Sequence, residues 1–463
     1  MKKNNISRRS FLKLFGAGTV ATAATLTGCK DTNKAGSMAK EEYKNQVEPP
    51  VGKMTYRENP KTKEKVSILG YGMMRLPSKA DKPDEFDQEM INKQIDYAIE
   101  HGMTYFDTSP VYCQGKSEHC TGIALHRHKR SEYFVATKLS NFNHDYWSFE
   151  KSKEMYHNSM KELQVDYIDY YLLHSVGGSM EEFKGRYIDN GMIDYLLKER
   201  EAGRIRNLGF SFHGKQEVFD EVLATNDKYH WDFVQIELNY VDWMYANEIN
   251  PRNTDAQYLY EELSKRNIPS VVMEPLLGGR LAKQPQGISL RFKQMDNEAS
   301  LAKWAFRFAG TPEKILTVLS GMTYMEHLIE NVSTYSPLEP LSDAENAFLL
   351  DIAKEICELK AIPCTACNYC MPCPYGLNIP GLFEHYNKCI SEGTMPSAMK
   401  TESNEYQRLR HAYLVGYDRA VPRLRQASHC IGCNHCVSHC PQRIDIPREM
   451  RKIDSFIEKL KQS

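Results

Sequence analysis

Two runs of four cysteines near the C-terminus constrain this chain more than any other feature of its sequence. Two residues separate neighbouring cysteines within a run, except that three residues precede the last cysteine of the second run. Each run ends in Cys-Pro. Three thiolates this close on one loop can reach three corners of a cubic metal cluster, and a distant fourth can close the site. Zinc and disulfides are the alternatives, but zinc ligands come as two spaced pairs per site rather than as such triplets.

The second run has the spacing of bacterial ferredoxins that bind four-iron, four-sulfur clusters, and the first run differs only in its shorter last gap. In such paired runs the fourth cysteine binds the other cluster. The sequence therefore predicts two [4Fe-4S] clusters, the first held by Cys364, Cys367, Cys370 and Cys440, and the second by Cys430, Cys433, Cys436 and Cys373.

The N-terminus carries an export pattern. Residues 7–13, SRRSFLK, are typical of a twin-arginine signal, and a mildly apolar stretch too short to span a membrane follows at residues 14–28. It ends in Leu-Thr-Gly-Cys, which predicts lipidation at Cys29, and cleavage near Ala21–Ala24 without a lipid is the alternative. The sequence thus predicts export to the periplasmic side, with the membrane contacted only through a lipid at Cys29. This route carries folded, cofactor-loaded proteins, as the predicted clusters require.

Charge and cysteine use narrow the function further. Lys and Arg number 59 and Asp and Glu 60, so nothing points to nucleic acid as a partner. The mean hydropathy of −0.56 argues against membrane spans. Cys113 and Cys120 either pair across their loop in an oxidising compartment or remain free thiols.

Apolar strand-like runs alternate with amphipathic helical patterns between residues 54 and 340. The strands are predicted at Val66–Tyr71, Met103–Thr108, Tyr133–Lys138, Tyr167–His174, Ile205–Ser211, Phe233–Asn239, Pro269–Glu274 and Ile315–Ser320. This repeat predicts an α/β fold, a (β/α)8 TIM barrel, with a doubly wound open sheet as the alternative. Residues 341–463 lose the strand signal and are predicted to form a small α-helical ferredoxin-like domain. Residues 1–29 are then the signal peptide, 30–53 a polar tether and 54–340 the barrel.

Polar residues collect at the ends of successive predicted strands, where TIM barrels place their chemistry. Asp107 follows the second strand, Lys138 closes the third and His174 closes the fourth, and Tyr112 lies on the loop after Asp107. A tyrosine is a poor proton donor at neutral pH unless a cation lies beside it, and Lys138 held by Asp107 could supply that cation. His174 could orient a carbonyl oxygen.

At these residues the chain resembles the aldo/keto reductases, in the subgroup with a C-terminal ferredoxin domain. The resemblance rests on FDTSPVY at 106–112, ATK at 136–138, DYYLLH at 169–174 and GFS at 209–211. It implies carbonyl–alcohol interconversion with Tyr112 as the acid, tuned by Lys138 and Asp107, and a small-molecule carbonyl or alcohol as substrate. It also implies NAD(P) as a cofactor, contacted by Ser211, Gln235, Gly278, Gly279, Arg280, Ser320, Gly321, Glu330 and Asn331.

The chain departs from the family pattern on the cofactor side. Phe212 stands where the family usually has Asn, and Met273-Glu274 stand where it often has Tyr-Ser. NAD, NADP or neither therefore stays open. Clusters carry single electrons whereas a hydride carries two. Three alternatives follow: a carbonyl reductase with a held nicotinamide, an electron-transfer protein that passes electrons through its clusters to a partner without free nicotinamide, or clusters that only hold the domain together.

Overall fold

Eight parallel strands close into a barrel within the part of the chain that the computed structural model describes, residues 48–80, 82–359, 361–396, 403–440 and 442–463. β12 pairs back onto β3, with Val318 opposite Leu69, so the sheet has no open edge. This closure confirms the predicted TIM barrel and excludes the open doubly wound sheet. Around the barrel the strands are β3 (Leu69–Gly72), β6 (Tyr105–Asp107), β7 (Phe134–Leu139), β8 (Ile168–Val176), β9 (Ile205–Phe212), β10 (Phe233–Glu237), β11 (Ser270–Met273) and β12 (Ile315–Ser320).

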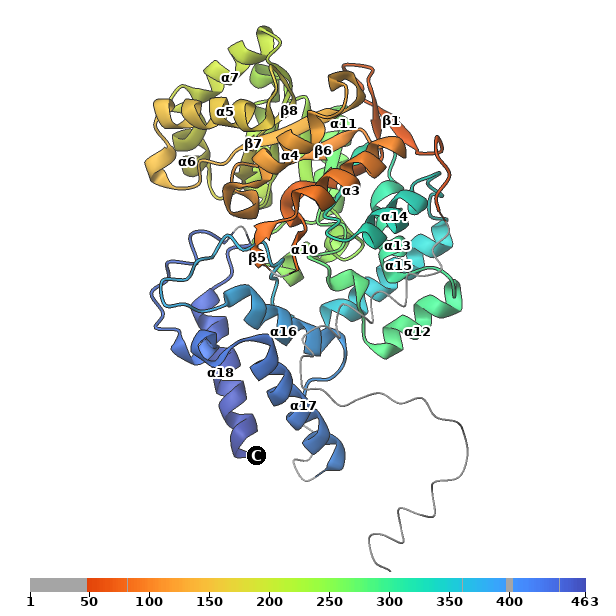
Figure 1. Cartoon of the computed structure of the whole chain (residues 1–463), viewed down its shortest axis with the longest axis vertical. Helices are drawn as coiled ribbons and strands as arrows, with labels where there is room; N and C mark the ends of the chain where they lie inside the picture. Colours follow the sequence, from red (N-terminus) through yellow and green to blue (C-terminus); the bar gives the residue numbers. More distant parts are fainter. Residues whose placement is uncertain (1–47, 81, 360, 397–402, 441) are drawn as a thin grey trace, which may run out of the picture. The chain divides into compact units, whose positions relative to one another are not determined.

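Helices alternate with these strands along the chain, as the colour gradient of Figure 1 shows. Several begin at a side-chain cap: Asp87 accepts from the backbone N–H of Met90, and Ser148 from that of Lys151. The helices are α3 (Gln88–Glu100), α4 (Ser117–Leu125), α5 (Phe149–Leu163), α6 (Met180–Phe183), α7 (Met192–Glu201), α8 (Gln216–Ala224), α9 (Asn226–Tyr229), α10 (Asp242–Ile249), α11 (Ala256–Lys265), α12 (Gln286–Met295), α13 (Leu301–Gly310), α14 (Met325–Thr334) and α15 (Asp343–Cys357).

The first predicted strand, Val66–Tyr71, is wrong as one element. β2 (Lys65–Ser67) pairs antiparallel with β1 (Tyr56–Glu58), and only β3 enters the barrel. The break falls at Ile68, whose backbone N–H and carbonyl bond to Thr55 and Val318. A continuous apolar run cannot reveal such a change of partner, because both halves are buried. A second hairpin, β4 (Ser78–Lys79) with β5 (Lys82–Phe86), follows η1 (Met73–Arg75).

Large side chains fill one end of the barrel interior. Tyr105, Tyr170 and Phe233 meet there, with ring centroids 4.9 and 5.1 Å apart along the series. This packing fills the barrel interior below the C-terminal strand ends, so the polar residues at those ends lie over a packed core and not over an open channel.

The C-terminal region is helical, as predicted, with no strand among its described residues. α16 (Ile379–Ser391), α17 (Asn404–Ala420) and α18 (Ile446–Gln462) share a hydrophobic core separate from that of the barrel. Asn378 and Asp445 cap α16 and α18, each of which has proline in its first turn. No helix in the described ranges is both long and apolar enough to cross a membrane. The signal peptide, Cys29 and most of the tether lie outside the described residues, and the domain limits stay predictions.

Candidate active site and cysteine pockets

The structure brings the four predicted acid–base residues together at the C-terminal ends of neighbouring strands. The Lys138 ammonium donates to Asp107 Oδ1 at 2.5 Å and to the Thr108 carbonyl at 2.8 Å. The same Nζ lies 4.9 Å from the centre of the Tyr112 ring. All four side chains are buried, with Lys138 wholly enclosed. The four residues predicted from their positions at or just after successive strand ends therefore lie together in one site.

His174 forms the opposite wall of this site. Its ring meets that of Tyr112 edge-on, with centroids 5.9 Å apart. Nδ1 lies 2.6 Å from the Ser140 hydroxyl, which leaves Nε2 for another partner. Burial, and then the charge of Lys138, hold the pKa of His174 well below its usual value, so the imidazole is neutral at pH 7. A neutral ring can donate a hydrogen bond without adding charge.

The Tyr112 phenol is protonated at neutral pH. Burial raises its pKa well above the ordinary value, and the charges of Asp107 and Glu274 raise it further. For the buried pair, burial lowers the pKa of Lys138 and raises that of Asp107, and their mutual attraction opposes both shifts. Tyr112 thus keeps its proton at neutral pH, and the Lys138 ammonium lies over its ring.

Sequence reasoning missed one residue of this site, Tyr369. It lies between Cys367 and Cys370, yet its ring stacks on Tyr112 with centroids 6.4 Å apart and planes 29° apart. It also meets His174 edge-on, with ring centroids 6.4 Å apart. The only signal in the sequence was an aromatic residue inside a cysteine run, which by itself indicates nothing.

The predicted cofactor residues divide into three groups, and part of their hydrogen-bonding capacity is used within the chain. Ser211 Oγ accepts from the Ser175 N–H at 2.8 Å, and Ser320 Oγ accepts from the Asn331 amide at 3.0 Å. Gln235 lies with Ser211 on adjacent paired strands, and its Oε1 is buried without a partner among the described residues. Gly321 is exposed and Glu330 half-buried, and both lie near Ser320 and Asn331 at the end of β12 and on α14.

The third predicted cofactor stretch, Gly278–Arg280, lies on the loop after β11. The Gly278 N–H donates to Glu274 Oε2 at 2.6 Å, and the Gly279 N–H donates to the Leu276 carbonyl. Nε and Nη1 of Arg280 are buried and have no hydrogen-bond partner in the described ranges. The two glycine amides therefore already have partners.

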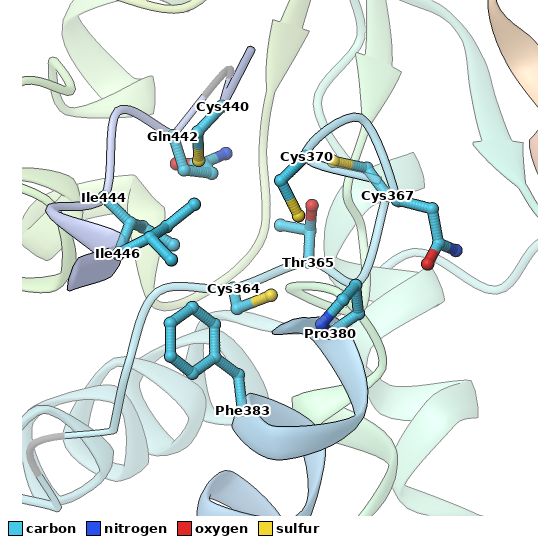
Figure 2. Close-up of a pocket in the computed structure, with 11 residues that line it drawn as sticks. Cys364, Thr365, Cys367, Cys370, Pro380, Phe383, Cys440, Gln442, Ile444 and Ile446 are labelled. Carbon is cyan, nitrogen blue, oxygen red and sulfur yellow. The ribbon is translucent and has the colours of Figure 1, made fainter. Parts of the chain in front are cut away.

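The eight cysteines of the two runs line two separate pockets. Figure 2 shows Cys364, Cys367 and Cys370 on one loop and Cys440, from a separate stretch of chain, at the same pocket. The other pocket is lined by Cys373, Cys430, Cys433 and Cys436. No group of three His, Cys, Asp or Glu side chains in the described ranges is arranged to hold a single metal ion. Cys113 and Cys120 are free thiols.

Buried Glu118, beside the site on α4, predicts a pH-dependent stability. Burial raises its pKa from 4.5 to about 7, and the hydrogen bond from Thr137 only partly opposes this. Between these values the folded state binds more protons than the unfolded state, so stability falls as pH rises. As the pH rises from 5.5 to 8, the free energy of unfolding of Glu118→Gln should therefore increase by about 2 kcal/mol relative to that of the wild type, since one pKa unit corresponds to about 1.4 kcal/mol. Thermal unfolding of both proteins across this range is the measurement, and a constant gap would contradict the shift.

Comparison with known proteins agrees with both halves of this structure. The aldo/keto reductase family model matches residues 68–353, and a 4Fe-4S dicluster domain model matches residues 363–444. The chain belongs to the aldo/keto reductase family and is an oxidoreductase that carries a 4Fe-4S dicluster domain at its C-terminus.

Similar proteins include an L-galactose dehydrogenase from Arabidopsis thaliana, 26% identical over 60% of this chain and 86% of that protein. The uncharacterized oxidoreductase YqkF from Bacillus subtilis is 25% identical over 58% of this chain and 86% of that protein. Among solved structures, the holo form of the aldo-keto reductase AKR11C1 from Bacillus halodurans has a TM-score of 0.51, 22% identity, and covers 65% of this chain and 96% of its own. An aldo-keto reductase from Klebsiella pneumoniae in complex with NADPH has a TM-score of 0.50, 19% identity, and covers 66% and 95%. These structural likenesses concern the fold alone.

Proposed function

We propose that the barrel interconverts a carbonyl and an alcohol, with Tyr112 as the acid–base group. The observation that carries this proposal is the enclosed contact of Lys138 with Asp107, directly beside the Tyr112 ring. A carbonyl oxygen placed between Tyr112 and His174 would meet two neutral donors. As the carbonyl carbon is reduced, charge develops on that oxygen, and a proton from Tyr112 neutralises it. Lys138 offsets the charge left on Tyr112, and Asp107 holds Lys138 in place.

The eight pocket cysteines fit two [4Fe-4S] clusters with exchanged fourth ligands. Cys440 lines the pocket of the first three cysteines of the first run, and Cys373 lines the pocket of the second run. Such clusters supply one-electron transfer when bound. The chain's own contribution is to place the first pocket beside the active site, since Tyr369 lies between two of its cysteines and against Tyr112.

Two forms of this activity remain, and they differ in their source of electrons. NAD(P) is one source, because a family member of similar fold was solved with NADPH. A partner that donates or accepts single electrons through the clusters is the other, and the contact of Tyr369 with Tyr112 favours it. In either form the substrate is a small carbonyl or alcohol compound.

The experiment is an assay on anaerobically purified, cluster-loaded full-length protein. A panel of aldehydes and ketones is incubated with reduced methyl viologen, and separately with NADPH and NADH, and alcohol products are measured. Alcohol formation with any of the three donors supports the proposed function. Failure of every carbonyl with every donor, and of every corresponding alcohol in the oxidising direction with oxidised viologen and NAD(P), would overturn it.

We also propose that the protein leaves the cytoplasm by the twin-arginine route and carries a lipid at Cys29. The support is the SRRSFLK run and the Leu-Thr-Gly-Cys sequence that ends the apolar stretch. Replacing Arg8 and Arg9 together by Lys keeps the charge but removes the motif, and should retain the protein in the cytoplasm. Cell fractionation is the measurement, and undiminished export would contradict the proposal. Cys29→Ser should release membrane-bound protein, whereas a wild type that is already soluble would refute lipidation.

A further inference from the structure

The loop Cys364–Cys370, here called the cysteine loop, lies directly against the loop that follows β11. A Cβ added to Gly278 would stand 2.7 Å from Thr365 Cα and 3.5 Å from the Cys364 carbonyl oxygen. Real Cβ atoms essentially never approach other atoms to 2.7 Å. Position 278 must therefore be glycine for the cysteine loop to pack this closely against it. Gly278 thus has a structural partner within the chain.

A pyrophosphate cradle needs backbone N–H groups that are free to point at the ligand. In this loop the Gly278 N–H is bonded to the Glu274 carboxyl group and the Gly279 N–H to the Leu276 carbonyl. A carboxyl oxygen therefore occupies the place that a phosphate oxygen would need.

Arg75 connects the cysteine loop to the loop after β12. Its guanidinium donates to the Thr365 carbonyl, and its aliphatic chain lies 3.2 to 3.3 Å from the position of a Cβ on Gly321. Ser320 and Asn331, two of the predicted NAD(P) contacts, lie on one side of this connection, and Gly278 lies on the other. An extended dinucleotide would have to pass where Arg75 and Thr365 meet.

A second anchor holds the stretch after Cys440 on the same face of the barrel. The Gln442 side chain donates to Glu237 Oε1, and the Asn250 amide donates to the Gln442 carbonyl at 2.8 Å. Glu237 ends β10 and Gln442 is buried, so this contact is enclosed. Both stretches that line the first cysteine pocket are therefore tied to the barrel.

At the nicotinamide end, Tyr369 lies against Tyr112 and His174. The Ser211 hydroxyl accepts from the Ser175 N–H, and the Gln235 amide nitrogen lies 3.3 Å from Met273 Sδ. Among the groups just named, Gln235 Oε1 is the one buried atom that has no hydrogen-bond partner in the described part of the chain. One open acceptor does not make a dinucleotide site.

We propose that the cysteine loop is a built-in occupant of the dinucleotide path, and that this barrel does not bind free NAD(P). The inference rests on the proposed carbonyl–alcohol activity for its chemistry. Reduction of a carbonyl to an alcohol breaks the C=O π bond, forms one C–H and one O–H bond, and consumes two electrons and two protons. The O–H proton comes from Tyr112, the second proton comes from solvent, and the electrons come from two equivalents of a reduced, low-potential one-electron carrier protein.

Direct binding is the first test. Cluster-loaded full-length protein is dialysed to equilibrium against NADPH and against NADH up to about 1 mM, with the Klebsiella pneumoniae reductase as positive control. We expect saturable binding to the control and none to this chain. Saturable binding of either nucleotide to this chain would overturn the inference.

The outcome for the proposed function is separate. Alcohol formation with reduced methyl viologen but without nucleotide binding supports both statements. If NADPH binds and drives reduction, the function stands and the inference falls. If no donor and no oxidant supports turnover and no nucleotide binds, the inference stands and the function falls.

Two neighbouring glycines provide a matched pair for the contact itself. Gly278 and Gly279 both have positive φ, +67° and +92°, so alanine is strained at either position. Of the two, Gly278 is the one whose added Cβ meets the cysteine loop, since no atom of the described residues lies within 4 Å of a Cβ on Gly279. We expect Gly278→Ala to lower iron content or shift the electron paramagnetic resonance spectrum of the reduced protein, and Gly279→Ala to leave both unchanged. Equal behaviour of the two variants, or loss in Gly279→Ala alone, would contradict the contact.

Discussion

Tyr112→Phe should reduce carbonyl turnover about 10²- to 10⁴-fold, because loss of a positioned proton donor typically has that effect. The variant keeps the ring that stacks on Tyr369 and faces Lys138. It removes only the hydroxyl, so folding and iron content should remain those of the wild type. The assay is alcohol formation with whichever electron donor supports the wild type, beside iron determination and thermal unfolding.

Tyr171→Phe is the matched control for this loss. Tyr171 lies on β8, three residues before His174, and is as buried as a tyrosine can be, but its hydroxyl has no hydrogen-bond partner among the described residues. Removal of the Tyr171 hydroxyl should leave turnover within about twofold of the wild type, because this hydroxyl is not part of the site and donates no proton to the substrate. Full turnover in Tyr112→Phe with every carbonyl that the wild type reduces would show that another group is the acid.

The fold could be predicted because its signals are local and repeated. The bounds of the predicted strands Tyr133–Lys138 and Ile205–Ser211, for example, agree with those of β7 and β9 to within a residue. The positions of Asp107, Lys138 and His174 followed from the rule that parallel strands present their C-terminal ends on one face. Closure of the barrel then required them to be neighbours, which the distances confirm.

What sequence could not predict were contacts between distant segments. Tyr369 reaches Tyr112 across more than 250 positions, and Thr365 reaches Gly278 across almost 90, and neither pair has a periodic or spaced signature. The sequence also suggested that Lys138 would lower the pKa of the Tyr112 phenol. The structure encloses the phenol near two carboxyl groups, and desolvation, which depends on burial alone, raises that pKa instead.

The exchanged ligation of the two clusters gives the other large expected effect. Cys440→Ala should damage the cluster of Cys364, Cys367 and Cys370, because its thiol lines their pocket although it follows the second run in sequence. Fully loaded wild type should contain about eight iron atoms per chain, and the variant should lose part of one cluster only. A content well below eight in reconstituted wild type would count against two four-iron clusters.

Comparison among variants assigns the damage without knowing beforehand which resonance belongs to which cluster. The electron paramagnetic resonance spectrum of reduced Cys440→Ala should match that of Cys367→Ala and differ from that of Cys433→Ala, since Cys433 lines the other pocket. Cys389→Ala is the control: this buried thiol belongs to the same hydrophobic core but lines neither pocket, so its spectrum should equal that of the wild type. A match between Cys440→Ala and Cys433→Ala would mean that each run binds its own cluster. The Cys-Pro position would then end a local site instead of joining the two runs, and the stretch anchored through Gln442 would no longer tie the first cluster to the barrel.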